Sequence, residues 1–278
     1  MSTIDLLLNL AGVLLWLGWR AVGLVGPAPA ATISSVLKRA ESRRPRRWLF
    51  LVWLVALLAL RGLVYLRIGS SVNWVPGLNI LVVRPEFNSV SPERMLVFSF
   101  ASFGFTLGVL YMWLGLVSVL HRRAPETEVW PKLVRLHLGV LERLPPALKL
   151  TAPIVLVAAL WVAVNPLMAN AGMVPQPVSA TQLWEQAVLV GLGTMLAWKY
   201  LLALILFLGV LNSYLYLGTS SFWAFVGSTS RNLLQPLQRL PLRAGRVDCA
   251  PLVGLAACWL GFTALERLLH LLLARLPL

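Results

Sequence analysis

Six apolar stretches dominate the sequence, and each is long enough to cross about 30 Å of hydrocarbon, which needs roughly 20 helical residues. We place them at 4–25, 48–67, 94–120, 151–170, 184–214 and 250–273. Hydrophobic residues make up 59% of the 278 residues and charged residues only 12%, too little polar surface for a water-soluble globule of this size. The sequence therefore predicts an all-α polytopic membrane protein with about six transmembrane helices.

Basic residues are concentrated in three alternate connections between these stretches. Segments 26–47, 121–149 and 215–248 hold 6, 6 and 4 Lys or Arg residues, which is 16 of the 24 in the chain. Because cytoplasmic loops of membrane proteins are enriched in Lys and Arg, we expect these connections in the cytoplasm and both termini outside a bacterial cytoplasmic (inner) membrane. The first apolar stretch contains Arg20 and lacks a basic region before it, so we expect it to be retained rather than removed as a signal peptide.

The net charge of +14 has two explanations, nucleic acid binding and contact with a membrane surface. The basic residues lie next to apolar stretches, including the basic arm at 38–47, where anionic lipid headgroups attract them. We therefore expect the bilayer and its anionic lipids as partners, with no nucleic acid.

Two of the basic connections contain an amphipathic segment. Apolar residues recur at helical steps in each, with basic residues mostly between them. The later segment has Phe222, Phe225, Val226, Leu233, Leu237 and Leu240, and the earlier one has Trp130, Leu133, Val134, His137, Leu141 and Leu144. Pro236 and Pro241 interrupt the later segment, which predicts short helices there. Such segments lie in the headgroup plane, pack under the bundle or bind a cytoplasmic or membrane protein partner.

The two segments belong to a repeat. Ala152-Pro153 matches Ala250-Pro251 and Trp161 matches Trp259, both at an offset of 98 residues. We therefore expect an N-terminal region at 1–93, a degenerate repeat at 94–170 and a second repeat at 184–278.

The connection into the last apolar stretch has a simple structural interpretation. Gly245 permits a turn, Asp248 can cap the next helix, and Pro251 is tolerated in a first helical turn. An ion or partner contact is the alternative for Asp248. In the earlier repeat, Thr151 takes the place of the cap.

The later repeat resembles the YggT (YlmG) family of integral membrane proteins. The resemblance is carried by positions that match the family pattern: Phe225-Val226, Thr229, Leu234, Pro236, Arg239, Pro241, Gly245, Asp248 and Pro251. The chain departs from the pattern at Ser220-Ser221, Gln235 and Ala250. The resemblance implies a membrane protein without recognised catalytic residues, in a family linked to membrane or division-site organisation and to osmotic-stress tolerance.

Ionisable residues within apolar stretches are costly and are therefore candidates for a functional site. Lys199 lies near the middle of 184–214, where it is interpreted as a snorkelling anchor, as part of a polar network, or as a transport residue. Arg20 and Arg61 are expected to be anchors. Glu266 and His270 lie one helical turn apart, which fits a solvated ion pair or a proton relay.

The sequence contains no motif for catalysis, metal binding or a cofactor. Cys249 and Cys258 are nine residues apart at the start of one span, which matches no metal or haem motif. We therefore expect a non-enzymatic membrane scaffold or organising protein, with a channel or secondary transporter for a small ion as the alternative. Gly104 and Gly108, with Gly191 and Gly193, are sites where helix backbones can approach closely.

Overall fold

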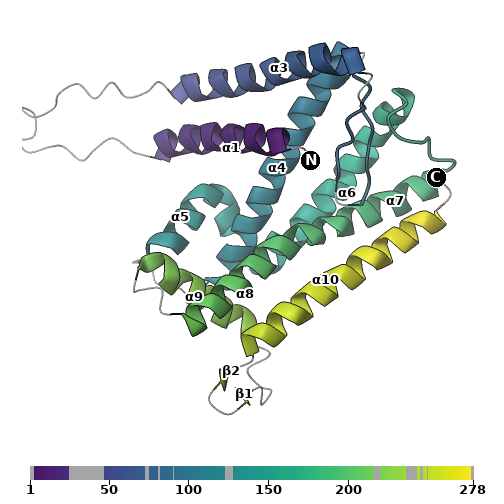
Figure 1. Cartoon of the computed structure of the whole chain (residues 1–278). Coiled ribbons are helices and arrows are strands. Elements are labelled where there is room, and N and C mark those ends of the chain that lie inside the picture. The colour runs from purple at the N-terminus through teal and green to yellow at the C-terminus, as the bar shows by residue number, and fades with distance from the viewer. Residues whose placement is uncertain are drawn as a thin grey trace, which may run out of the picture. The chain divides into compact units, whose positions relative to one another are not determined.

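The structure is a computed structural model that describes residues 3–24, 47–72, 75–80, 82–89, 91–122, 128–215, 220–235, 243–244, 247–248 and 250–276. Figure 1 shows that helices account for nearly all of these residues. The α-helices are α1 (Thr3–Leu24), α3 (Arg47–Val72), α4 (Pro92–Leu120), α5 (Val129–Leu138), α6 (Pro146–Asn170), α7 (Ala180–Gly193), α8 (Trp198–Tyr214), α9 (Ser221–Leu234) and α10 (Ala250–Arg275). Two short 3₁₀ helices, η1 (Gly139–Arg143) and η2 (Thr194–Ala197), and a two-residue hairpin of β1 (Arg243–Ala244) and β2 (Val247–Asp248) complete the described elements.

The predicted membrane architecture is confirmed. Among the described residues, six helical segments are long and apolar enough to cross a membrane: Thr3–Gly23, Arg47–Gly69, Pro92–Leu120, Pro146–Asn170, Ala180–Ser213 and Ala250–Arg275. Each coincides with one predicted stretch to within a few residues. The fifth comprises α7, η2 and α8, which follow one another along a single path in Figure 1.

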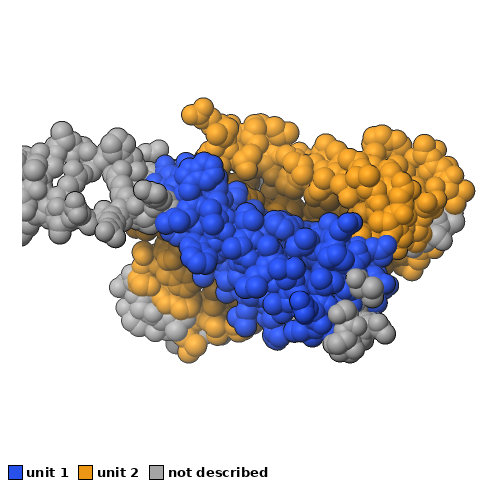
Figure 2. Space-filling view, turned by 90° about the horizontal axis from the view of Figure 1, so that it is seen from above, with its two compact units in different colours: residues 1–78, 86–107 blue, residues 79–85, 108–278 orange. Residues whose placement is uncertain are grey.

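The chain divides into two compact units, which Figure 2 colours separately. Unit 1 contains residues 1–78 and 86–107, and unit 2 contains residues 79–85 and 108–278. Both segments that were predicted to be amphipathic belong to unit 2. The division therefore differs from the boundary expected after residue 93, because α4 contributes its first half to unit 1 and its second half to unit 2.

Unit 1 is built from α1, α3 and the first half of α4. The helices α1 and α3 pack against each other along their length. From α4, the Ser99 hydroxyl donates to the backbone oxygen of Leu58 on α3 at 2.7 Å. Because α3 and α4 are mostly apolar, this hydrogen bond fixes their relative position at one point within the unit.

Unit 2 has α7 and α8 at its centre. On one side α6 packs along α7, and α10 packs along both α7 and α8. Gly191 makes the α6–α7 contact close, since a Cβ atom there would lie 2.7 Å from the backbone oxygen of Ile154 and 3.0 Å from the Cβ atom of Ala158. At Gly104 and Gly108, in contrast, a Cβ atom would have no atom of the described residues within 4 Å.

The 3₁₀ segment η2 is held by a pair of tryptophans. The Trp113 indole on α4 donates to the backbone oxygen of Ala197 at 2.7 Å, and the Trp198 indole donates to the backbone oxygen of Met112 at 3.3 Å. A 3₁₀ stretch within a helix changes the backbone hydrogen-bond pattern and leaves oxygens that need partners. The second half of α4 supplies a hydrogen-bond donor for one of these oxygens, the Trp113 indole.

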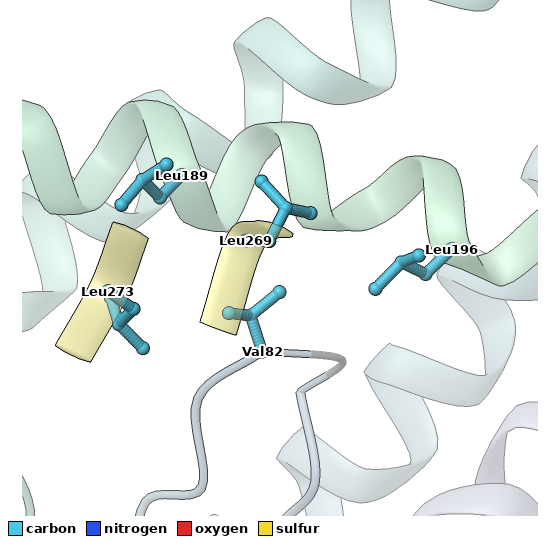
Figure 3. Close-up of a cluster of buried hydrophobic side chains, with 5 residues drawn as sticks. All are labelled: Val82, Leu189, Leu196, Leu269 and Leu273. Atoms are coloured by element: carbon cyan, nitrogen blue, oxygen red, sulfur yellow. The ribbon is translucent and has the colours of Figure 1, made fainter. Parts of the chain in front are cut away.

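A loop between α3 and α4 contributes to the core of unit 2. Figure 3 shows Val82 of this loop beside Leu269 and Leu273 of α10, with Leu189 of α7 and Leu196 of η2 completing the cluster. A second cluster joins Trp161 of α6 to Val174, Ala187 and Val190. These clusters place the loop residues 82–84 at the end of unit 2 where α7 begins and α10 ends.

The structure corrects one expected helix start. Thr151 does not cap α6, because α6 begins at Pro146 and the Thr151 hydroxyl donates to the backbone oxygen of Ala147, inside the helix. Two consecutive prolines, Pro145 and Pro146, start the helix instead, and a proline is well suited to a first turn because its missing N–H has no partner there. Pro251 lies in the first turn of α10, as predicted.

Candidate functional site

Unit 1 contains a buried ion pair within its apolar helices. The guanidinium of Arg61 on α3 donates through Nη2 to Oδ1 of Asp5 on α1 at 2.9 Å. Arg61 is only 3% exposed and Asp5 4%. An unpaired arginine at the centre of a spanning helix costs roughly 3 kcal/mol or more, so each charge makes the other tolerable in this position.

Three further polar residues surround the pair. Arg61 also donates through Nη1 to Asn9 at 2.6 Å and through Nη2 to Ser102 at 3.2 Å. The amide of Asn9 donates to Ser102 at 3.0 Å, and the Tyr65 hydroxyl donates to Asp5. We call Asp5, Asn9, Arg61, Tyr65 and Ser102 the unit 1 polar cluster. It joins all three helices of the unit.

The expectation that Arg61 anchors its helix at the membrane surface is wrong. Its side chain lies inside unit 1, where Asp5 satisfies its charge. The sequence does contain a signal for the cluster, since Asp5 and Asn9 are four residues apart, as are Arg61 and Tyr65. Polar residues at this spacing share one helix face, and such a face on two apolar stretches indicates a common buried site.

Unit 2 contains a second ion pair between spanning helices. Lys199 of α8 donates from Nζ to Oε2 of Glu266 on α10 at 2.8 Å, and its Nζ lies 4.8 Å from the ring centre of Trp259. Lys199 is 7% exposed, whereas the Glu266 side chain is 41% exposed. Lys199 therefore has a polar partner on the neighbouring helix, and its three interpretations stay predictions.

The predicted pairing of Glu266 with His270 is not seen. Both residues lie on α10, but Glu266 is engaged by Lys199 and the exposed His270 makes no hydrogen bond with any described residue. In the described part of the chain, no three His, Cys, Asp or Glu side chains converge as metal ligands. The arrangement around Lys199 is thus an ion pair with an aromatic neighbour.

At the other polar region of unit 2, His121 joins the end of α4 to α9. Its Nε2 lies 2.6 Å from the Thr229 hydroxyl, and its ring stacks on Phe225 with centres 4.8 Å apart. Asn232 of α9 donates to the backbone oxygen of Leu120 at 3.0 Å. Burial is the largest influence on the His121 imidazole and lowers its pKa. The charge of Glu128 raises this pKa, whereas the charge of Arg135 lowers it.

The two predicted amphipathic segments meet in this region. Trp130 of α5 lies 5.5 Å from Phe222 and 6.0 Å from Phe225, both on α9, between ring centres. Close by, Glu142 of η1 accepts from Lys149 at 2.9 Å and from Ser118 of α4 at 2.6 Å. We call the part of unit 2 formed by α5, η1, α9, the end of α4 and the start of α6 the α5/α9 end.

Four of the residues that carry the YggT resemblance lie outside the described part of the chain: Pro236, Arg239, Pro241 and Gly245. The position of Asp248 is described only as the last residue of β2. Its expected role as a helix cap therefore stays a prediction. Pro251 is buried in the first turn of α10, and Thr229 is the hydrogen-bond partner of His121.

Comparison with family models, curated proteins and solved structures finds no match to this chain. The arguments on function below therefore start from the geometry of the described residues.

Proposed function

We propose that this protein is a non-enzymatic organiser of a bacterial cytoplasmic membrane, which gathers anionic lipid at its α5/α9 end. The observation that carries the proposal is an outward-facing apolar surface on α5 and η1. Val129, Leu133 and Leu136 are spaced by four and three residues on α5, and all are exposed, as is Val140 of η1. We call these four residues the α5–η1 apolar surface.

The surroundings of α5 explain why this surface points away from unit 2. Trp130 packs on the aromatic rings of α9, and Pro131 and Leu138 are buried. Gly139 then ends the helix with a positive φ of 57°, which glycine adopts readily. The apolar residues that recur at helical steps in this segment are thus divided, since Trp130 faces the unit while Leu133 is exposed. Exposed apolar residues at helical spacing are typical of a helix that lies in the headgroup region.

Basic residues next to this surface favour an anionic lipid partner. Lys132 and Arg143 flank it and are exposed, and Arg122 and Arg231 are exposed at the same α5/α9 end. Glu142 does not offset them, because it is engaged by Lys149. Each basic residue near an anionic membrane surface contributes about 1 kcal/mol of attraction.

The proposal places the α5/α9 end on the cytoplasmic side of the membrane. The α5/α9 end carries two of the three basic connections predicted to be cytoplasmic, and a cytoplasmic leaflet is the one rich in anionic lipid. The resemblance to the YggT family adds support, since its members are linked to membrane organisation. A cytoplasmic or membrane protein that docks on the same surface would extend this role.

The proposal is tested by measuring how deeply α5 enters the bilayer. A fluorophore is attached at Leu136→Cys, in a variant with Cys249 and Cys258 replaced by alanine, and the protein is placed in nanodiscs with brominated lipid. We expect strong quenching that increases with the anionic lipid content. The matched control is Gln235→Cys, an exposed polar position at the end of α9, which should be quenched weakly. Equal, weak quenching at both positions would contradict the proposal.

A channel or secondary transporter for a small ion is the second candidate, and the Lys199–Glu266 pair favours it. Paired charges within spanning helices mark ion or proton pathways in many transporters. Ion flux into liposomes is compared between the wild-type protein and Lys199→Leu. Saturable flux that Lys199→Leu abolishes would support transport, whereas absence of flux would remove this candidate.

A further inference from the structure

The last spanning helix, α10, lies at the edge of unit 2. It packs against α7 and α8, alongside which it runs in Figure 1. Only 11% of its most apolar stretch is buried, compared with 44% for the span that comprises α7, η2 and α8. Much of the surface of α10 therefore lacks a protein neighbour among the described residues.

Six residues at alternating steps of four and three share one face of this helix. They are Leu252, Ala256, Trp259, Thr263, Glu266 and His270, and we call them the α10 seam. All six are exposed or partly exposed. The same spacing forms the contact line between two helices that cross at about 20°, which is the most frequent arrangement in membrane bundles. The α10 seam therefore has the spacing of a surface that packs on another helix.

The polar end of the α10 seam lies at a depth where contact with lipid is costly. A helix of 26 residues is about 39 Å long, so it extends about 5 Å beyond each side of a hydrocarbon layer of about 30 Å. Glu266 lies nine residues, or about 14 Å, before the last residue of α10, and is thus within this layer. Charged side chains at this depth almost always face protein or a water-filled cavity. The Glu266 side chain is nevertheless 41% exposed, which indicates a partner that covers it.

Glu266 and His270 have hydrogen-bonding capacity that unit 2 does not use. Lys199 donates to Oε2 of Glu266 at 2.8 Å, whereas Oε1 has no partner among the described residues. The exposed imidazole of His270 has none there either. A carboxylate oxygen accepts and an imidazole N–H donates, so the two groups are complementary. Because donor and acceptor lie on one face, that face is complementary to a second copy of itself.

We propose that a second copy of this chain packs along the α10 seam, with His270 of each copy donating to Glu266 of the other. Two copies in one membrane have the same orientation, so their α10 helices run parallel and a two-fold axis makes the contact reciprocal. Lys199 neutralises each Glu266, so the dimer does not bring two unpaired negative charges together. Ala256 and Thr263 are small, as is typical of interfaces between spanning helices, and allow the two helices to approach closely.

Disulfide cross-linking in the native membrane tests the α10 seam. Ala256→Cys and Ala257→Cys are made in a variant in which Cys249 and Cys258 are replaced by alanine. Both alanines are exposed neighbours on α10, but only Ala256 belongs to the seam. We expect a mild oxidant to convert Ala256→Cys into a covalent dimer, because the two copies of a seam residue meet across the two-fold axis. Ala257→Cys should remain mostly monomeric, since a disulfide requires Cα atoms about 4.4–6.8 Å apart.

Association in liposomes tests the proposed hydrogen bond. Copies that carry a donor or an acceptor fluorophore are mixed, and energy transfer is recorded as added lipid dilutes the protein. His270→Leu should weaken association by about fivefold or more, because it removes both reciprocal hydrogen bonds. His270→Gln keeps a donor and should associate nearly as the wild type does. The matched control is Arg275→Gln, which changes an exposed residue of α10 outside the seam and should leave association unchanged.

The results that would overturn the proposal are distinct. Equal cross-linking of Ala256→Cys and Ala257→Cys would contradict the dimer, as would a protein that stays monomeric at every protein-to-lipid ratio. Cross-linking of Ala256→Cys to a different protein would assign the seam to that protein instead. Wild-type association of His270→Leu would contradict the hydrogen bond to Glu266. No seam residue belongs to α5, η1 or α9, so failure of the dimer leaves the proposed lipid contact unaffected, and failure of the lipid test leaves the dimer unaffected.

Discussion

Arg61 and Asp5 lie 56 positions apart in the sequence, yet Nη2 of Arg61 donates to Oδ1 of Asp5 at 2.9 Å inside unit 1. The pair connects α3 to α1, and Ser102 connects both to α4 through bonds from Arg61 and Asn9. Apolar helices in a bilayer gain little from burying apolar side chains against one another, because lipid tails are equally apolar. We therefore infer that this cluster determines how the helices of unit 1 fit together.

Removing one partner of the pair should destabilise the protein strongly. In Arg61→Met the Asp5 carboxylate stays buried without its cation, and breaking a buried pair in this way costs about 3–5 kcal/mol. Asp5→Leu should cost a similar amount, whereas the double variant should cost less than the sum of both. Unfolding in detergent measures all three.

The exposed Glu93 of α4 provides the control for this experiment, since Glu93→Gln should change stability by less than about 0.5 kcal/mol. Additive effects of Asp5→Leu and Arg61→Met would show that the two charges do not interact and would contradict the structure of the cluster.

The sequence was sufficient to predict the spans but not their polar contacts. Each span is fixed by local hydropathy, so the helices were located to within a few residues. The position of Arg61 depends on a partner in another helix, and a charge in an apolar stretch is equally compatible with an anchor at the surface. The polar contact of Lys199 could not be predicted for the same reason, since its partner Glu266 is 67 residues further along the chain.

The Lys199–Glu266 pair should contribute less than the pair in unit 1. Glu266 is partly exposed, so Lys199→Met should cost more than the roughly 1 kcal/mol of a surface pair but less than the roughly 3 kcal/mol of a buried one. Thermal unfolding in detergent measures the change. Arg267→Gln, an exposed neighbour on α10, is the control and should leave the midpoint nearly unchanged. A Lys199→Met effect as small as that of the control would contradict an interaction.

Gly191 should tolerate no side chain at the α6–α7 contact. The Cβ atom of Gly191→Ala would meet the backbone oxygen of Ile154 at 2.7 Å, which requires a backbone shift and should cost about 1–3 kcal/mol. Gly108→Ala is the matched control, because that position has open space and alanine favours the helix by about 0.5–1 kcal/mol. Opposite changes in stability are expected, and equal changes would contradict the close approach.

His121 should make the stability of unit 2 depend on pH. Burial holds the pKa of its imidazole below the ordinary value of 6.5, so the folded protein binds this proton less readily than the unfolded chain. The neutral imidazole therefore contributes fully to the stability of the fold above about pH 6.5. This contribution is lost as the pH falls from there through the lowered pKa of the folded state. His121→Gln can keep a hydrogen bond to Thr229 but does not titrate, so its unfolding midpoint should fall less between pH 7 and about pH 5. A parallel fall in both proteins would contradict this role.

The α5/α9 end shows where an amphipathic pattern gives an incomplete prediction. Helices were expected at both segments, and α5 and α9 are found there. The pattern did not distinguish which apolar residues face the unit, because Trp130 finds its partners on α9, about ninety residues further on. Leu133 and Leu136 are exposed because the break at Gly139 and the contact with α9 set the orientation of α5.

The lipid composition around the protein tests the central proposal most directly. The protein is extracted from its native membrane in polymer nanodiscs, and the copurified lipids are compared for the wild type and for Lys132→Gln/Arg143→Gln, which removes two exposed charges beside the α5–η1 apolar surface. Arg267→Gln/Arg275→Gln removes two exposed charges from α10 and is the matched control. We predict that the first variant loses the anionic lipid enrichment of the wild type, by about 1 kcal/mol per charge, while the control retains it. The same anionic lipid fraction in all three samples would contradict the account.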